Sequence, residues 1–401
     1  MSTSSIATSP PPSNRRYQRL AELVHPISPE TFEREYYQQR PLVVQRDDPR
    51  YYAHLLTLAD MDGILATMAV PDSSIRLVNR GTATRLSDLS TAGGAAEAIY
   101  REYRKGATVN VMFLHDRWPP LGRLCRVLAA QFTATVQTNV YLTPRHSQGL
   151  NPHYDTHDVF VAQIHGSKHW RLYDSAVRLP LTEHRPVAPE GGFGAPVREF
   201  DMRPGDLLYL PRGTAHDATS NDEASLHLTI GVAPLTWAGF LELALRDAAA
   251  RDVRLREAVP RDPGELRDTV TRLLAGISGQ VDEISLLNQA RQALADGGAA
   301  ELSGHLLDLE AVPGLDLDTP LFPRTGLSAS LSITDGAACL EFHRKSIRMP
   351  ARVAEELRFV TERPGFTGRE IPGPLDESGR LVLLRTLLRE GVLTHHAPAD
   401  A

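Results

Sequence analysis

Residues able to do chemistry crowd the segment Asn151–Trp170, NPHYDTHDVFVAQIHGSKHW. It carries four histidines, two aspartates and a lysine in a region whose composition is otherwise typical of β-strand. Ionisable side chains are costly to bury unless a partner compensates them. The segment is therefore a metal site, the surface of a solvated hairpin, or a chance cluster.

Metal binding is the interpretation that the spacing favours. His153 and Asp155 stand two residues apart, which places both side chains on one face of an extended chain. Further on, PGDLLYLPRGTAHDA carries His216 just beyond an apolar strand. Two imidazoles and one carboxylate are the ligands of non-haem Fe(II) oxygenases, which leave positions open for a 2-oxo acid and O₂. We predict that His153, Asp155 and His216 bind Fe(II) and form the catalytic centre.

Zinc hydrolysis is the alternative chemistry for the same three residues, because this ligand set also binds Zn²⁺. The chain has no HExxH-type general base, however. A zinc site would also leave Lys168 without a role.

Lys168 is the predicted anchor for a co-substrate. In the segment HDVFVAQIHGSKHWRLY, taken as one alternating strand, Lys168 and Trp170 share a face. If that face points inward, the ammonium is buried and requires an anionic partner, for which the distal carboxylate of 2-oxoglutarate is suitable. A surface lysine on a hairpin is the alternative. Asn139 and Tyr141, on the preceding strand QTNVYLTP, are predicted to bind the co-substrate from a neighbouring inward face.

The remaining histidines of the segment are not expected to bind the metal. His157 continues the series of alternate residues, but the triad is complete without it, so we expect it to contact the substrate or to support a ligand. His165 and His169 are out of phase with Lys168 and are expected to point outward.

A β-rich region has to position these side chains. From about residue 75 to residue 232, short apolar or alternating runs recur between turn residues, which predicts an antiparallel sandwich or barrel. Before it, Ser28 caps a short helix that leads into a strand at Leu42–Val44.

The character of the chain changes after Pro234. Residues 236–310 show the apolar spacing of amphipathic helices, whose stripe packs within the chain or, alternatively, against a second copy. From Leu315, short strands precede two helices, which fits a small α+β domain of the winged-helix type.

Composition narrows the functional classes. The 401 residues are 42% hydrophobic and 23% charged, as in an ordinary globular protein, and the formal charge of −6 argues against nucleic-acid binding. Two distant cysteines exclude a disulfide framework and favour a reducing cytoplasm. No run is long and apolar enough for a membrane span, and the Ser/Pro-rich residues 1–16 are expected to be a disordered leader.

The central motifs resemble the JmjC-type ribosomal oxygenases, which are cupin-like protein hydroxylases. The resemblance is carried by NVYLTPRHSQGLNPHYDTHDVFVAQIHGSKHWRLY and RPGDLLYLPRGTAH, and it extends to the segments LVHPISPETFEREYYQQRPLVV and GRLVLLRTLLREGVLT. It implies an α+β fold: a double-stranded β-helix (a JmjC or cupin jelly roll) over 17–235, a helical dimerisation domain over 236–312 and a winged helix over 313–401.

The resemblance also implies an activity. Members use Fe(II) and 2-oxoglutarate to hydroxylate a side chain, often the β-carbon of His or Arg, in a ribosomal protein. A homodimer is expected, with no nucleic-acid or membrane partner. The alternatives are tailoring of a peptide natural product, N-demethylation, and a non-catalytic cupin scaffold.

Two departures from the family pattern are visible. Lys168 replaces the arginine of the arginine-hydroxylating branch and matches the histidine-hydroxylating branch. Gly231 and Val232 stand where the family tends to have small hydroxyl residues, which leaves one end of the pocket open to question.

Overall fold

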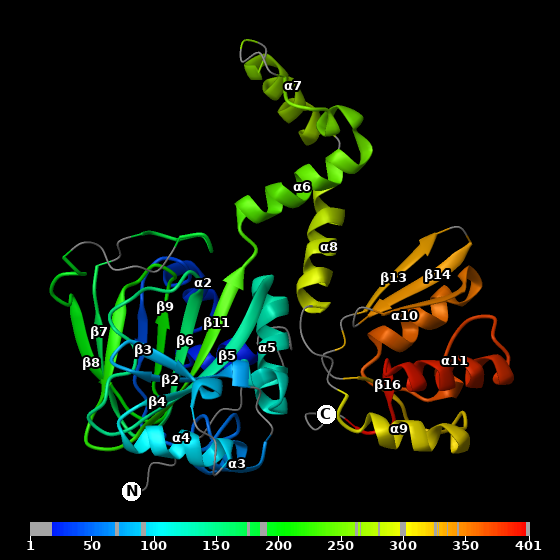
Figure 1. Ribbon diagram of the computed structural model, residues 1–401. Helices are drawn as coiled ribbons and strands as arrows, with labels where there is room; N and C mark the ends of the chain where they lie inside the picture. The colour runs from blue at the N-terminus through cyan, green and yellow to red at the C-terminus, as the bar shows by residue number, and fades with distance from the viewer. Residues whose placement is uncertain are drawn as a thin grey trace, which may run out of the picture. The chain divides into compact units, whose positions relative to one another are not determined.

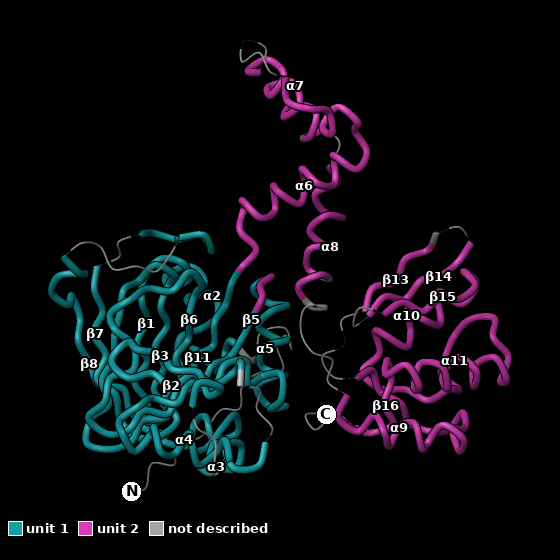
Figure 2. The backbone as a smooth tube through the Cα atoms, viewed as in Figure 1, with its two compact units in different colours: residues 1–132, 136–233 teal, residues 133–135, 234–401 magenta. Residues whose placement is uncertain are grey.

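The computed structural model describes residues 18–68, 72–89, 94–174, 177–184, 191–260, 264, 266–279, 281–296, 302–324, 327, 329–334, 336–342 and 345–397. They form two compact units, residues 1–132 with 136–233 and residues 133–135 with 234–401 (Figure 2). The predicted leader, residues 1–16, lies outside the described residues.

The first unit is built on a large sheet with the order β1-β9-β6-β11-β5-β4-β2-β3. Pairing is antiparallel along β1-β9-β6-β11 and along β5-β4-β2-β3. The strands are β1 Leu42–Val44, β2 Ile75–Asn79, β3 Thr82–Arg85, β4 Thr108–Met112, β5 Ala134–Thr143, β6 Asp158–His165, β9 Leu207–Leu210 and β11 Ser225–Pro234.

A smaller sheet, β10-β7-β8, completes the strands of this unit. Its strands are β7 Lys168–Leu172, β8 Arg198–Met202 and β10 His216–Ser220, and neighbours are antiparallel. An apolar core joins the two sheets; it consists of Val159, Val161, Trp170, Leu172, Met202, Leu208 and Leu210. The predicted antiparallel sandwich is therefore observed (Figure 1).

The prediction of one alternating strand from His157 to Tyr173 is wrong. The chain turns at Gly166, whose φ is +61°, so that β6 and β7 enter different sheets. A Cβ on Gly166 would lie 1.9 Å from the carbonyl oxygen of Ala224, so the turn requires glycine. Lys168 begins the new strand β7, in which alternate residues from Lys168 onward are buried, so it still faces inward.

Among its described residues, the first unit also has five α-helices, four of which are labelled in Figure 1. They are α1 Gln18–Val24, α2 Pro29–Glu35, α3 Leu58–Thr67, α4 Ala95–Arg104 and α5 Pro119–Phe132. The predicted cap is present, since the Ser28 side chain accepts a hydrogen bond from Thr31 N. Strand β6 is buried on both faces through Gln163, which explains why its sequence is nearly continuously apolar.

The described residues at the start of the second unit form three α-helices, α6 Trp237–Arg251, α7 Leu266–Ser278 and α8 Glu283–Asp296. Helices α7 and α6 are in contact, as are α6 and α8. Large apolar side chains nevertheless remain exposed on α6 and α7: Trp237, Leu241, Leu245, Leu266, Val270 and Leu274.

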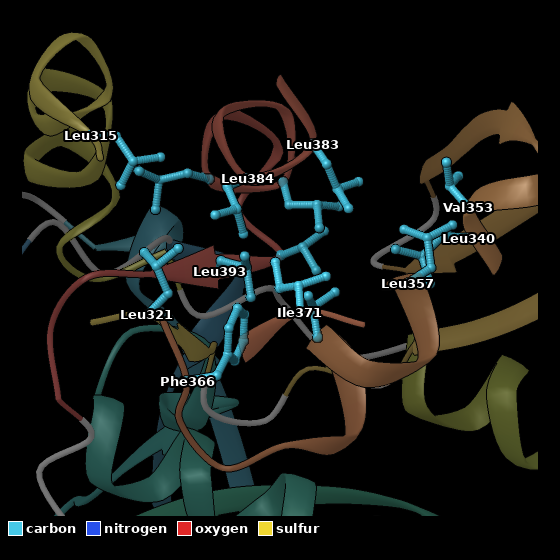
Figure 3. Close-up of a cluster of buried hydrophobic side chains, with 14 of the residues drawn as sticks. Leu315, Leu321, Leu340, Val353, Leu357, Phe366, Ile371, Leu383, Leu384 and Leu393 are labelled. Atoms are coloured by element: carbon cyan, nitrogen blue, oxygen red, sulfur yellow. The ribbon is translucent and has the colours of Figure 1, made fainter. Parts of the chain in front are cut away.

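The C-terminal part combines α9 His305–Ala311, α10 Ala354–Glu362 and α11 Glu377–Glu390 with short strands. The strands are β12 Phe322–Pro323, β13 Ala329–Thr334, β14 Ala337–Phe342, β15 Lys345–Pro350 and β16 Leu393–Thr394. Strands β13-β14-β15 form an antiparallel sheet, and a buried cluster that includes Leu357, Phe366, Leu384 and Leu393 forms the core (Figure 3).

Within the described ranges, none of the helices combines the length and the apolar content that crossing a bilayer requires.

Candidate active site

The first unit contains a cavity of about 240 Å³ among its β-strands. Side chains on the inward faces of both sheets line it, together with residues of the loop before β6. The lining residues are Thr108, Asn139, Tyr141, Gly149, Leu150, His153, Asp155, His157, Val159, Val161, Lys168, Trp170, His216, Asp217, Ala218, His227 and Thr229. The structure thus places all six predicted site residues on the wall of one cavity.

The three predicted metal ligands come together. One potential ligand atom from each of His153, Asp155 and His216 lies within 4.8 Å of the others. His216 Nε2 lies 3.8 Å from Asp155 Oδ2, and the two imidazole rings are 4.6 Å apart. The backbones of His153 and His216 also bond to each other, with N···O distances of 3.1 and 2.8 Å.

Backbone carbonyls orient both imidazoles. His153 Nδ1 lies 2.8 Å from the carbonyl oxygen of Asn151, and His216 Nδ1 lies 3.0 Å from that of Thr214. A carbonyl only accepts, so in the neutral form of each ring the proton is on Nδ1 and Nε2 keeps its lone pair. Metal-binding histidines generally have this arrangement. Sequence reasoning missed Asn151 and Thr214, since a carbonyl contribution leaves no signal in residue type.

The electrostatics also fit a divalent metal. Burial, reinforced by the nearby His153, lowers the pKa of His216 to about 4, so its imidazole is neutral near pH 7. Burial alone would raise the pKa of Asp155, but the adjacent histidines, His153 first, hold it below its ordinary value. The site therefore offers one carboxylate and neutral imidazole, the protonation states in which metals bind these groups.

Two turns support the segments that carry His153, Asp155 and His216. The turn between β2 and β3 supports the segment before His153, because Gly81 N donates to the carbonyl of Gly149 at 2.7 Å and a Cβ on Gly81 would collide with Asn151. The turn before His216 is bonded to the segment after Asp155, since Gly213 N donates to the Asp155 carbonyl at 2.9 Å.

A buried ion pair reinforces the second turn. Asp158 is fully buried and accepts hydrogen bonds from Arg212, through the backbone N at 3.0 Å and Nη1 at 3.3 Å. The hydroxyl of Tyr209 lies 3.3 Å from the same carboxylate. These contacts fix the turn that carries Thr214, whose carbonyl orients His216.

Lys168 lies at the other end of the cavity from His216. Strands β7 and β10 pair Lys168 with Ser220 and Leu172 with His216, so the two residues are four pairs apart, about 13 Å along the strands. Lys168 is 5% exposed, its Nζ donates to Thr143 Oγ1 at 3.2 Å, and burial lowers its pKa to about 7. Among the described residues lining the cavity, Lys168 is the only lysine or arginine.

Tyr141 and Asn139 lie on β5 as predicted, but their side chains make different contacts. The Tyr141 ring stacks on His227, with 4.9 Å between centroids and 7° between planes. The amide oxygen of Asn139 accepts a hydrogen bond from Phe113 N at 3.2 Å, which leaves its NH₂ group to act in the cavity.

His227 was missed by sequence reasoning. Its ring is 4% exposed, and burial, followed by the charge of Lys168, lowers its pKa well below the ordinary value. It is therefore neutral and adds no charge at the Lys168 end. On β11 it alternates with Leu226, Leu228 and Ile230, so the apolar pattern alone would have assigned it to an outward face.

The predictions for the other histidines differ in outcome. His157 lines the cavity without joining the ligand group. His169 points away, with its ring nitrogens 2.8 Å from Asp201 Oδ1 and 3.1 Å from Glu199 Oε2. His165 is only partly buried at the end of β6.

A second group of potential ligands, Asp308, His395 and His396, lies in the C-terminal part. The Asp308 carboxylate is already occupied, because it accepts hydrogen bonds from Arg324 and from Thr394 Oγ1 and contacts His395 Nδ1. It is therefore the centre of a buried ion pair that ties α9 to the end of the chain.

Comparisons with known proteins show which proteins the chain is similar to. Residues 113–240 match the family model of the JmjC domain. The chain is similar to ribosomal oxygenases of animals. It is 35% identical over 286 residues to ribosomal oxygenase 2 of Mus musculus, and the match covers 68% of this chain and 59% of that protein. It is 36% identical over 263 residues to ribosomal oxygenase 1 of Homo sapiens, covering 63% and 41%.

The chain spans about half the length of the curated relatives it matches. The predicted resemblance to the JmjC-type ribosomal oxygenases is confirmed by these matches.

Solved structures share the fold. The ribosomal oxygenase YcfD of Escherichia coli aligns with a TM-score of 0.53 at 15% identity, over 92% of this chain and 98% of that one. The same protein in complex with cobalt and 2-oxoglutarate aligns with a TM-score of 0.54. The predicted cupin-like JmjC fold is confirmed. The helical dimerisation domain and the winged helix stay predictions.

Proposed function

We propose that this chain, which carries a JmjC domain and resembles the ribosomal oxygenases, is an Fe(II)- and 2-oxoglutarate-dependent oxygenase. Its substrate is a ribosomal protein or a peptide, and it hydroxylates an amino-acid side chain, at the β-carbon of His or Arg. The observation that supports this most is one cavity with a two-histidine, one-carboxylate triad at one end and a buried, isolated lysine at the other.

The triad fits Fe(II) by the chemistry of its donors. His153 and His216 would bind through Nε2 and Asp155 through a carboxylate oxygen, with both rings held by backbone carbonyls. When bound, Fe(II) supplies the electrons that activate O₂ for the oxidative decarboxylation of 2-oxoglutarate. Zinc hydrolysis would leave the buried Lys168 without an anionic partner.

The protein's own residues bind and orient the reactants. Lys168, with Thr143, receives the distal carboxylate of 2-oxoglutarate, and Trp170 and the Tyr141–His227 stack form walls that exclude water. The C1 carboxylate leaves as CO₂. One oxygen atom of O₂ enters succinate and the other replaces a substrate C–H bond with C–OH.

The other candidate functions differ in product. A ribosomal protein, or a peptide natural-product precursor, would gain one oxygen atom. N-demethylation would instead remove a methylene group as formaldehyde. A non-catalytic scaffold would form no succinate. Mass spectrometry of ribosomal proteins and small peptides from cells with and without the gene separates them, and an unmodified set of proteins would count against the proposal.

Co-substrate binding should depend on pH through Lys168. Because burial lowers the pKa of Lys168 to about 7, the free protein loses the ammonium as the pH rises above 7, whereas a bound carboxylate favours it. We therefore expect the dissociation constant of 2-oxoglutarate to be flat below pH 7 and to rise about tenfold per pH unit above it. Isothermal titration calorimetry in the presence of Mn(II) measures this dependence.

Lys168→Arg is the matched control for the pH dependence. A guanidinium stays charged throughout this range, so the rise above pH 7 should disappear. A dissociation constant that rises equally in both proteins would show that another group is responsible.

We further propose that the chain forms a homodimer through α6 and α7. On α6, Trp237, Leu241 and Leu245 follow a helical spacing and are 80%, 62% and 46% exposed, as expected of an interface. Leu241→Asp is expected to halve the mass measured by analytical ultracentrifugation, and Arg246→Asp, an exposed change on the same helix, should leave it unchanged. A wild-type monomer would contradict the proposal. A cytoplasmic location is likewise proposed from the cysteine content.

A further inference from the structure

Two neighbouring histidines, His395 and His396, lie close together just after strand β16 in the second unit. Their ring centroids are 3.9 Å apart and their planes are inclined by 41°. One potential ligand atom of each ring and one carboxylate oxygen of Asp308 lie within 4.8 Å of one another. Two imidazoles at this distance repel each other when both are protonated, whereas a cation that accepts a lone pair from each stabilises both.

Asp308 fixes the position of the proton on His395. His395 Nδ1 lies 2.7 Å from Asp308 Oδ1, and an ionised carboxylate only accepts, so the neutral ring carries its proton on Nδ1 and keeps a lone pair on Nε2. Metal-binding histidines typically donate one ring nitrogen to a carboxylate in this way, because the carboxylate orients the ring and raises its basicity. His395 is therefore oriented to bind a metal through Nε2.

The Asp308 carboxylate is itself held rigidly by surrounding donors. It is fully buried, Arg324 donates to Oδ2, and Thr394 Oγ1 and His395 N donate to Oδ1 at 3.0 and 3.1 Å. Burial alone would raise the pKa of Asp308, but hydrogen bonds from His395 and Thr394 and the charge of Arg324 hold it below its ordinary value. Asp308 therefore stays ionised, and its lone pairs are used to orient His395 rather than to bind a metal directly.

The nitrogens that would bind the metal have no competing partner. Among the residues that the structure describes, neither His395 Nε2 nor the His396 ring takes part in a hydrogen bond or an ion pair. The side chain of His395 is 26% exposed and His396 is exposed, so water can complete the coordination of a bound ion. His305, also close to Asp308, is occupied, because its Nδ1 lies 3.3 Å from Arg324 Nη2, which only donates.

The chemistry of the donors selects the kind of metal. Imidazole nitrogens suit Zn²⁺, Ni²⁺ and Cu²⁺, whereas Mg²⁺ and Ca²⁺ are bound through oxygen atoms. The charge of Asp308 is already balanced by Arg324. A hard cation would therefore find neither the oxygen ligands nor the excess negative charge that it needs.

We infer that His395 and His396 form a second metal site, in the C-terminal part of the chain, for a divalent cation of the zinc type, and that Asp308 orients its first ligand. Asp308 belongs to α9, and the two histidines follow β16. Because the ion binds the arrangement in which His395 is fixed by Asp308, it stabilises the contact between α9 and the segment after β16.

Titration of the full chain with Zn(II) counts the sites. The two-histidine, one-carboxylate triad of the first unit also accepts Zn²⁺, so isothermal titration calorimetry should find two ions per wild-type chain. His153→Ala, which disables the triad, should bind one ion. His396→Ala should also bind one, and a protein with both changes should bind none.

His395→Asn separates metal binding from folding. The amide nitrogen of asparagine replaces Nδ1 and keeps a donor for Asp308, but the variant has no counterpart of Nε2. It should therefore fold as the wild type does and bind one Zn(II) fewer. His146→Ala is the matched control, because it removes another exposed histidine, one that lies 3.6 Å from Asp222, and it should keep both ions.

Thermal unfolding gives a second readout. An ion that binds only the folded chain stabilises it, so saturating Zn(II) should raise the Tm of His153→Ala and leave that of the protein with His153→Ala and His396→Ala unchanged. A zinc count that stays at the wild-type value in either His396→Ala or His395→Asn would overturn the inference, whatever the triad binds.

Discussion

Replacing His153 with alanine is expected to abolish metal binding. The side chain offers one of the three potential ligand atoms, and among the described residues this group has no fourth member that could replace it. We expect the affinity for Mn(II) or Fe(II) to fall by more than about 100-fold, the upper end of the loss for a residue that only orients a ligand. Electron paramagnetic resonance titration with Mn(II) measures the affinity, and turnover should fall to background.

Two control variants test whether the loss of metal affinity is specific to His153. His157→Ala removes a cavity histidine outside the ligand group and should leave the metal affinity nearly unchanged. His169→Ala removes a histidine that contacts Glu199 and Asp201 outside the cavity, and should do the same. If His157→Ala weakened metal binding as much as His153→Ala, the assignment of the three ligands would be wrong.

Replacing Lys168 with alanine is expected to abolish co-substrate binding while sparing the metal. Removing one partner of a buried charge pair costs about 3–5 kcal/mol, which corresponds to a loss in affinity of about 100-fold to 4,000-fold. The loss should be near the upper end, because Lys168 is the only lysine or arginine among the described residues of the cavity. Calorimetric titration with 2-oxoglutarate in the presence of Mn(II) measures it.

Lys168→Met keeps the aliphatic length of the side chain and separates charge from packing. It should bind 2-oxoglutarate as poorly as Lys168→Ala, with an unaltered affinity for Mn(II). Retained 2-oxoglutarate affinity in Lys168→Met would mean that the distal carboxylate is held elsewhere.

Residue type and spacing were sufficient to predict which side chains gather in one cavity. His153 and Asp155 are close in sequence and share a face by strand geometry, and His216 follows a recognisable turn and strand. Lys168 could be predicted because a lysine on an inward face has few uses other than binding an anion. These inferences depend on local geometry, which the sequence determines directly.

Other features depend on contacts between distant segments. The turn at Gly166 requires glycine because the carbonyl of Ala224 lies against it. The ring of His157 likewise lies against Gly231, which is far from it in the sequence. The carbonyls of Asn151 and Thr214, which orient the imidazoles, are common to all residue types. No local pattern encodes such contacts, so they emerge only from the folded structure.

The central claim is that the triad and Lys168 together bind Fe(II) and 2-oxoglutarate for reaction with O₂. It is tested most directly by adding both to the full chain without O₂ and recording the visible spectrum. We expect a metal-to-ligand charge-transfer band that requires both additions, disappears with formation of succinate when O₂ is admitted, and is absent in His153→Ala. A wild-type protein that binds Fe(II) yet shows neither band nor succinate would contradict the account.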